Sequence, residues 1–220
     1  MDTIECIKTR RSIRQFKPEP VPREILFELI DVAKWSPSYK NSQPWEFIIL
    51  SGPKKEALTR TLLEILEQGK PSCPDLPHPT KWPPAEAARI DHLMKLRAKL
   101  SGVDVNNPDA LIEAKKANFS FYGAPHVIYI YQDASLSPWS IFDSGLFTQT
   151  LLLAAFSRGL GTVPQAFATD YAEDIKKFLS IPETKRLVIG ISIGYPDMES
   201  PKNAFRSDRS ATDDFVKWIE

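Results

Sequence analysis

Two short segments carry the side chains best suited to bind a charged ligand. Residues 9–16 contain Arg10, Arg11 and Arg14, whose guanidinium groups are planar, permanently charged and rich in N–H donors. Such groups suit phosphate oxygens or an electron-rich ring edge. Residues 36–45 read Ser-Pro-Ser-Tyr-Lys-Asn-Ser-Gln-Pro-Trp and add small polar groups. Together the segments predict a pocket for a phosphorylated aromatic ligand, although the first segment alone is also typical of a solvated helix face or of partners for nearby carboxylates.

Side chains for acid–base or nucleophilic catalysis are scarce. The histidines His78, His92 and His126 belong to no nucleophile elbow and to no His-x-x-x-His metal pattern. Cys73 and His78 fall short of the roughly three or four protein ligands that zinc uses, so no metal site is predicted. Residues 159–161 lack the third glycine of a dinucleotide fingerprint, and the chain has no Walker-type Gly-Lys-Ser/Thr sequence. A bound cofactor would supply chemistry that these side chains cannot.

Composition and charge exclude several classes of function. The chain has 220 residues, 42% of them hydrophobic, and we expect a single domain over residues 1–220. The 28 basic residues equal the 28 acidic ones, so no global field favours nucleic acid or an anionic membrane. No apolar run reaches the roughly 20 residues of a membrane-spanning helix, and the first residues lack a signal-peptide pattern, which predicts a cytoplasmic protein. Cys6 and Cys73 are too few for a disulfide framework.

Apolar spacing and turn residues indicate which elements position the two segments. Residues 25–33 repeat with helical spacing after a proline, and residues 45–50 have β-strand composition. The polar loop of residues 36–44 therefore joins a helix to a strand, where recognition groups are commonly displayed. Prolines break residues 70–84, and we expect an excursion over about residues 70–120, with charged helices, near the mouth of the site.

The second half of the chain contains long apolar segments. Residues 141–156 are apolar at nearly every turn, which indicates a helix in the centre of a large core or one covered by a second subunit. Residues 126–131 and 187–193 have the composition of buried strands. The chain ends on the apolar run of residues 215–219, and such a tail needs a docking surface.

The pairing of the two polar segments resembles the nitroreductase family of FMN-dependent oxidoreductases. In that family a basic-basic-Ser-x-basic run follows the first helix, and a Pro-Ser-x-x-Asn-x-Gln-Pro-Trp loop joins the second helix to the first strand. Residues 159–166, 194–197 and 206–209 resemble the family's flavin-edge loop, late strand-end turn and C-terminal phosphate contact. The resemblance runs from about residue 5 to residue 219, and its closest motifs are those of nitroaromatic-reducing members.

The resemblance implies a fold, a cofactor and a partner. The fold would be of the α+β class, a three-layer α-β-α sandwich with a mostly antiparallel central sheet. Two chains would form a homodimer that exchanges C-terminal segments. FMN would bind at the subunit interface, NADH or NADPH would reduce it, and a small planar aromatic substrate would follow.

The resemblance also assigns cofactor-binding roles to particular residues. Arg10 and Arg209, with Arg206 as a second candidate, would bind the FMN phosphate together with Arg11 and the hydroxyl group of Ser12. Arg14 would face the N1–C2 edge of the ring, where a fixed cation makes the flavin a better hydride acceptor. The remaining assigned residues are those of the loop that reaches the partner's flavin, a helix-end amide and the segment near flavin N5, namely Pro37, Ser38, Tyr39, Asn41, Gln43, Asn118, Pro164, Gln165 and Ala166.

Some assignments leave alternatives open. A common family form has an acidic residue and then glycine after Pro164, whereas this chain has Gln165 and Ala166, so the hydrogen bond to N5 stays open. Asn118 would either reach the O4 edge of the flavin or be an ordinary helix-end amide. A group of aromatic residues would frame a flat slot above the flavin or simply belong to the core, and these residues are Tyr39, Phe119, Phe121, Tyr122 and Phe167.

The predicted activity is hydride transfer from NAD(P)H, through flavin N5, to a nitroaromatic or quinone-like acceptor by a ping-pong mechanism. No side chain is expected to act as an essential catalytic base. Enzymes of the same fold with other substrates are the alternative: an enone reductase, a dehalogenase or a flavin-fragmenting enzyme. A further alternative is a storage or regulatory protein that binds FMN without turnover.

Overall fold

The centre of the computed structural model is a four-stranded sheet, and the structure describes residues 2–101 and 107–220. The strands have the order β1-β2-β4-β3, and each neighbouring pair is antiparallel. Their bounds are β1 (Glu46–Ser51), β2 (His126–Asp133), β3 (Gly161–Gln165) and β4 (Lys185–Gly194). The predicted strands at residues 45–50, 126–131 and 187–193 correspond to β1, β2 and β4.

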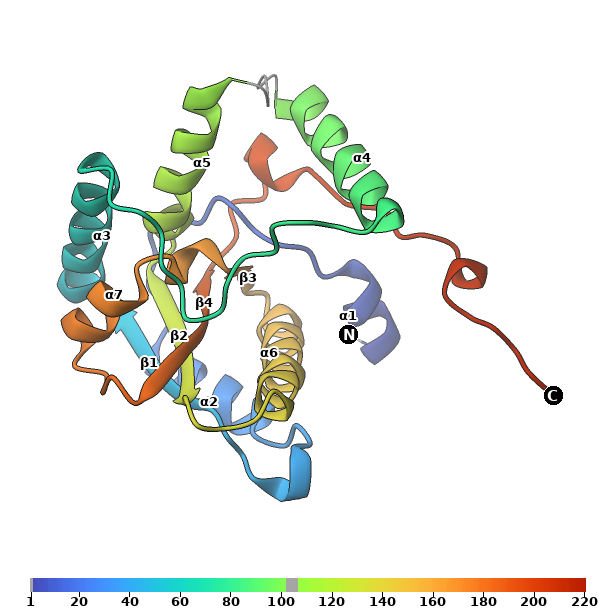
Figure 1. Ribbon diagram of the computed structural model, residues 1–220, viewed down its shortest axis with the longest axis horizontal. Helices are drawn as coiled ribbons and strands as arrows, with labels where there is room; N and C mark the ends of the chain where they lie inside the picture. The colour runs from blue at the N-terminus through green and yellow to red at the C-terminus, as the bar shows by residue number, and fades with distance from the viewer. Residues whose placement is uncertain (1, 102–106) are drawn as a thin grey trace.

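Helices cover both faces of this sheet (Figure 1). The α-helices described are α1 (Thr3–Thr9), α2 (Arg23–Ala33), α3 (Gly52–Glu67), α4 (Pro84–Ser101), α5 (Pro108–Phe119), α6 (Trp139–Ser157) and α7 (Ala172–Leu179). Short 3-10 helices are η1 (Tyr39–Asn41), η2 (Phe121–Gly123), η3 (Phe167–Thr169), η4 (Pro201–Asn203) and η5 (Thr212–Asp214).

Alternation along β2 divides the core between the two faces. Ile128 and Ile130 join a buried cluster with α2 and α6, while Val127 and Tyr129 join a second cluster with α3, α5 and α7. All four side chains are fully buried, as expected for a strand with helices on both faces. The predicted α+β fold with three layers and an antiparallel sheet is therefore confirmed.

Helix α6 differs from the sequence expectation in one respect. Phe147, Leu151 and Ala155 are fully buried, and α6 packs on α2. However, Trp139 is 62% exposed and Phe142 is 58% exposed, so one face of α6 is open to solvent in the single chain. The centre-of-core alternative is wrong for that face, which is apolar and available to a partner.

Strand β3 was not predicted from the sequence, where residues 159–166 were expected to form a loop. Gly159 ends α6 with φ +76°, and the chain then extends along β4 from Gly161. β3 is an edge strand that pairs with β4 alone among the strands, and such a position tolerates Pro164, which has no N–H to donate. On its outer side, the N–H group of Ile13 donates to the carbonyl of Thr162 at 3.0 Å.

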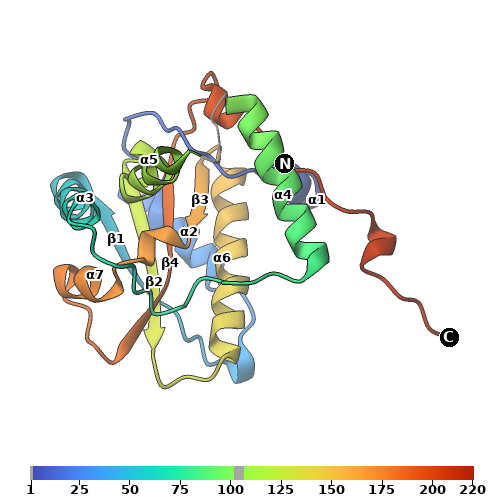
Figure 2. The ribbon, with the colours of Figure 1, turned by 45° about the horizontal axis from the view of Figure 1, so that its top comes forward.

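The proline-rich excursion is attached to the sandwich at its start. The N–H group of Cys73 donates to the carbonyl of Asp170 at 2.7 Å, and His78 pairs with the Asp170 carboxylate at 2.6 Å. The excursion continues into α4, which lies outside the layers (Figure 2). Residues 102–106, within the excursion expected over about residues 70–120, lie outside the described residues.

The C-terminal segment runs past α4 and then away from the body of the molecule (Figures 1 and 2). His92 of α4 pairs with Asp208 at 3.3 Å. Beyond η5 the tail is apolar and uncovered, with Trp218 80% exposed and Ile219 78% exposed. None of the described helices is long and apolar enough to cross a membrane.

Candidate active site

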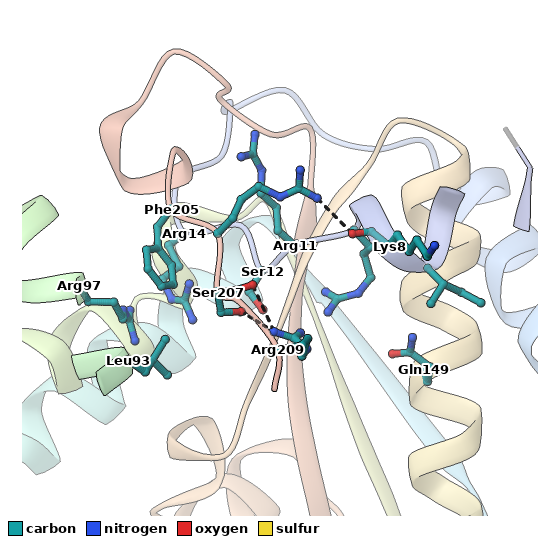
Figure 3. Close-up of a pocket in the computed structure, with 13 residues that line it drawn as sticks. Lys8, Arg11, Ser12, Arg14, Leu93, Arg97, Gln149, Phe205, Ser207 and Arg209 are labelled. Atoms are coloured by element: carbon teal, nitrogen blue, oxygen red, sulfur yellow. Dashed lines mark hydrogen bonds between the residues drawn. The ribbon is translucent and has the colours of Figure 1, made fainter. Parts of the chain in front are cut away.

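A cavity of about 570 Å³ opens between α1, α4, α6 and the C-terminal segment (Figure 3). Much of its wall comes from the segment after α1 and from residues 205–209, which lie at opposite ends of the chain. The lining residues are Ile7, Lys8, Arg10, Arg11, Ser12, Arg14, Leu93, Arg97, Gln149, Phe205, Arg206, Ser207 and Arg209. The structure thus brings Arg10, Arg11, Ser12, Arg14, Arg206 and Arg209, all assigned from the sequence, into one cavity.

The charge of this cavity has one sign. Lys8 and six arginines line it, and none of its described lining residues is acidic. Burial and the nearby Arg209 lower the pKa of Arg10. Burial and the nearby Arg14 lower the pKa of Arg97. Within this cavity Arg10 and Arg209 repel each other, as do Arg14 and Arg97, and an anion would stabilise each of these two pairs.

Unused hydrogen-bond donors support the same conclusion. Nη1 of Arg10 and Nε of Arg14 are buried and have no hydrogen-bond partner. A buried donor without a partner costs about 1–3 kcal/mol, more when the group is charged, and native proteins rarely keep one without a reason. Phosphate oxygens or ring carbonyl oxygens would satisfy these N–H groups.

The cationic segment is held by contacts at several points. Gly161 permits the close approach of Ile13, because a Cβ atom at position 161 would lie 2.8 Å from Cγ1 of Ile13. The buried Asn203 accepts from the N–H group of Arg14 at 2.7 Å and donates to the carbonyl of Gln15 at 2.7 Å. Sequence reasoning missed Asn203, because an asparagine in a loop looks like any other turn residue.

The predicted loop residues lie at a second cavity, not at the first. Pro37, Ser38 and Tyr39 line a hollow of about 280 Å³ together with Trp139, Phe142, Asp143 and Leu146. The ring of Tyr39 stacks on that of Trp139 with centroids 6.4 Å apart, and the N–H group of Tyr39 donates to Asp143 at 3.1 Å. Asn41 and Gln43 follow in the same loop, where the N–H group of Gln43 donates to Oγ of Ser38 at 3.0 Å.

The two cavities share one helix. Leu146 lines the second cavity and Gln149 lines the first, and with Trp139 and Phe142 they follow the three-and-four spacing of a single helix face. The open face of α6 thus runs from one cavity to the other. Within one chain, the predicted loop therefore does not contribute to the cationic cavity.

Gln165 and Asn118 form a buried network at the end of β3. Nε2 of Gln165 donates to the carbonyl oxygen and to Oδ1 of Asn118, at 3.0 and 3.2 Å. The Ser192 hydroxyl group donates to Oε1 of Gln165, and Nδ2 of Asn118 donates to the carbonyl of Ala114 at 2.8 Å. The amide of Asn118 is thus engaged within the protein. Gln165, like its neighbours Pro164 and Ala166, lines neither cavity.

The aromatic slot is only partly supported. Phe119 and Phe121 are fully buried members of the core cluster on the α3 side. The alternative that these two residues frame a ligand slot is therefore wrong. Tyr39 is 57% exposed and Phe167 is 36% exposed, so these two remain accessible to a ligand. Tyr122 is partly buried beside the segment that carries Ile13.

Comparison with known proteins identifies the family. The model of the nitroreductase family matches residues 7–195. This chain belongs to the nitroreductase family. A 4-nitrobenzoate reductase of Pseudomonas putida is 33% identical over 219 residues, which cover 99% of this chain and 96% of that protein. A chloronitrobenzene nitroreductase of Comamonas testosteroni is 28% identical over 222 residues, which cover 98% of this chain and 96% of that protein.

A solved nitroreductase also has the same fold. The crystal structure of the FMN-dependent nitroreductase NfnB from Mycobacterium smegmatis, in complex with NADPH, superposes with a TM-score of 0.93 at 27% identity. The match covers 99% of this chain and 97% of that one. For a nitroreductase, a cationic cavity with two unpartnered arginine N–H groups fits the phosphate and polar ring edge of FMN.

Proposed function

We propose that this nitroreductase binds FMN in the cationic cavity and reduces nitroaromatic compounds with NADH or NADPH as reductant. One observation carries the proposal: a cavity lined by six arginines and, among the described residues, by no acidic one, with a buried N–H group of Arg10 and another of Arg14 left without partners. The family membership and the activities of the relatives point to the same reaction. When bound, FMN supplies the redox chemistry, which is a two-electron exchange as hydride.

The proposed roles of the arginines follow from their pairing. Arg10 and Arg209 bind the phosphate group, with Arg206 and Arg11 at its edge and Ser12 as a hydroxyl donor. Arg14 binds the polar edge of the ring, where its positive charge stabilises the negative charge that develops on reduction. Among the described residues that line the cavity, none is a histidine, aspartate or glutamate that could act as a catalytic base, so these side chains bind and orient the ligands and exclude water.

A spectrum tests the binding step. The purified protein should be yellow with the absorption of FMN, and anaerobic addition of NADH or NADPH should bleach it. Subsequent addition of a nitroaromatic compound should restore the colour. A colourless protein that gains no absorption on reconstitution with FMN contradicts the proposal, and a yellow protein without steady-state oxidation of NAD(P)H is the storage or regulatory alternative.

Two substitutions separate phosphate binding from ring binding. Arg209→Gln should weaken FMN binding roughly 10- to 100-fold, because one charge-assisted contact contributes about 1.5–3 kcal/mol. Arg14→Gln should slow the reduction by NAD(P)H more than it weakens FMN binding. Arg60→Gln is the matched control, since Arg60 is exposed on α3 far from the cavity. Equal losses of FMN in both cavity variants would refute this division of roles.

We further propose a homodimer that pairs the open face of α6. That face exposes Trp139 and Phe142, and the tail exposes Phe215, Trp218 and Ile219, which is more uncovered apolar surface than an isolated chain usually keeps. In the dimer the loop with Pro37, Ser38, Tyr39, Asn41 and Gln43 would come from one chain to the cationic cavity of the other. The C-terminal tails would exchange between the two chains.

Sedimentation tests the dimer. The FMN-loaded protein should sediment as a dimer at micromolar concentration, and Phe142→Asp should shift it towards monomers, because a charge placed in an apolar interface is strongly unfavourable. Leu111→Asp on α5 is the matched control, since Leu111 is 59% exposed on another helix. A wild-type monomer, or equal dissociation of both variants, contradicts the proposal.

The proposal also includes a single domain and a cytoplasmic location. We propose that residues 1–220 form one FMN-binding domain, with residues 70–120 as an excursion near the mouth of the site. Limited proteolysis should then cut first within the excursion and leave no independently stable half. We also propose a cytoplasmic location, which fractionation of the source cells would check.

A further inference from the structure

We propose that Arg97 recognises a carboxylate on the aromatic ring of the acceptor, so that the enzyme prefers nitroaromatic carboxylates to neutral nitroaromatics. The inference rests on the proposed function and specifies the substrate class of the same cavity.

Helix α4 brings Arg97 to the cavity from outside the sandwich. Leu93 and Arg97 are one helical turn apart, and both line the cavity (Figure 3). The Cζ atom of Arg97 lies 6.0 Å from the centre of the Phe205 ring, at the limit of a cation–π contact. The Phe205 ring supports the guanidinium group of Arg97, and the N–H groups of Arg97 stay available to a ligand.

Arg97 has no anionic partner among the described residues. Two other cations of α4 are paired, since Arg89 contacts Glu86 and Lys95 contacts Asp91. Arg97 forms no such pair with a described carboxylate, although burial and Arg14 disfavour its charge. A half-buried guanidinium next to a like charge is the arrangement that a ligand anion would stabilise.

The charge of FMN is too small to occupy both arginine pairs. Its single phosphate carries about two negative charges and is assigned to Arg10 and Arg209. Arg14 is assigned to the ring edge, which leaves Arg97 without an assigned anion in the cavity that it shares with Arg14. A benzoate-type carboxylate is planar, lies in the plane of the reacting ring and matches the two-pronged geometry of a guanidinium group. The cavity thus favours a nitrobenzoate, which is an anion, over a chloronitrobenzene, which is neutral.

The test compares acceptors that differ in charge but hardly in shape. Wild type, Arg97→Gln and Arg97→Lys are assayed with 4-nitrobenzoate and with the neutral 4-nitrobenzamide. For Arg97→Gln, kcat/KM for 4-nitrobenzoate should fall roughly 10- to 100-fold, the size expected for one charge-assisted pair, and that for 4-nitrobenzamide by less than about threefold. For Arg97→Lys, kcat/KM for 4-nitrobenzoate should lie between the values of wild type and Arg97→Gln, because lysine keeps the charge but cannot bind a carboxylate in bidentate fashion. Lys95→Gln, on the exposed side of α4, should match wild type.

Equilibrium binding gives a readout that does not depend on turnover. Benzoate, which has no nitro group, should bind to the oxidised FMN-loaded enzyme by calorimetry, and Arg97→Gln should weaken it by the same factor. Equal losses for both acceptors overturn the inference. So does a rise in the KM for NADPH with both acceptors unaffected, because the anion at Arg97 would then be a phosphate of the reductant. If wild type reduces neither acceptor, the proposed function fails, and benzoate binding still decides the role of Arg97.

Discussion

Replacing Gln165 with leucine tests how the end of β3 is fixed beside the site. The side chain of Gln165 is 2% exposed and connects Asn118 of α5 to Ser192 of β4. Leucine has nearly the same volume, so no large cavity forms. It removes the donor to Asn118 and the acceptor for the hydroxyl group of Ser192, which is fully buried.

The expected cost follows from the two groups left unpaired. Each buried polar group without a partner costs about 1–3 kcal/mol, so Gln165→Leu should lower the free energy of unfolding by roughly 2–6 kcal/mol. The second substitution Ser192→Ala separates the two contributions. In wild type it should destabilise by about 1 kcal/mol or more, but in the Gln165→Leu background it should stabilise, because it removes the orphaned hydroxyl group.

Equilibrium urea unfolding followed by circular dichroism measures both effects. Protein concentration and FMN must be held constant, because ligand binding and dimer formation add to the apparent stability. A loss below about 1 kcal/mol for Gln165→Leu would refute the reasoning on unpaired groups. So would an equal loss from Ser192→Ala in both backgrounds, since the two residues would then not be coupled.

Three further predictions concern other residues that hold the site or the sheet in place. Gly161→Ala should cost about 1–3 kcal/mol of unfolding free energy and weaken FMN binding in a titration, because the new Cβ atom would lie 2.8 Å from Ile13. Asn203→Ala should raise the dissociation constant of FMN without moving the dimer equilibrium, because it frees the backbone of Arg14. Burial, and to a lesser extent the nearby Lys55, lowers the pKa of His126 below its ordinary 6.5. The folded protein therefore favours the neutral imidazole. The resulting contribution to stability is fully present above about pH 6.5 and is lost as the pH falls below that value. Melting temperatures from pH 8 to 5 should fall more steeply for wild type than for His126→Gln.

Most of the fold could be predicted because its signals are local. Helix α2 shows regular apolar spacing, and β2 and β4 are runs of branched and aromatic residues. Strand β3 escaped prediction because Gly161 and Pro164 suppress the composition of a strand. Its existence depends on pairing with β4 and with the segment that carries Ile13, and pairing between distant segments leaves little trace in local composition.

The candidate site was predictable only where the family motifs run. Arg10, Arg14 and Arg209 stand in such motifs, and the structure brings them into one cavity. Arg97 stands in a helix with charges of both signs, which is typical of a solvated surface, and no pattern distinguishes it from its paired neighbours. Only the position of α4 above the cavity separates Arg97 from Lys95.

Helix α6 connects the two parts of the proposed enzyme physically. Its buried face is fixed against the sheet by Phe147 and Leu151, so its open face has a defined position relative to the cationic cavity. That open face carries Phe142 at the second cavity and Gln149 at the first. In the proposed homodimer, a partner that covers this face would bring its own loop near the arginines of this chain. Because FMN and the partner then contact a common surface, binding of either one stabilises the arrangement that the other requires.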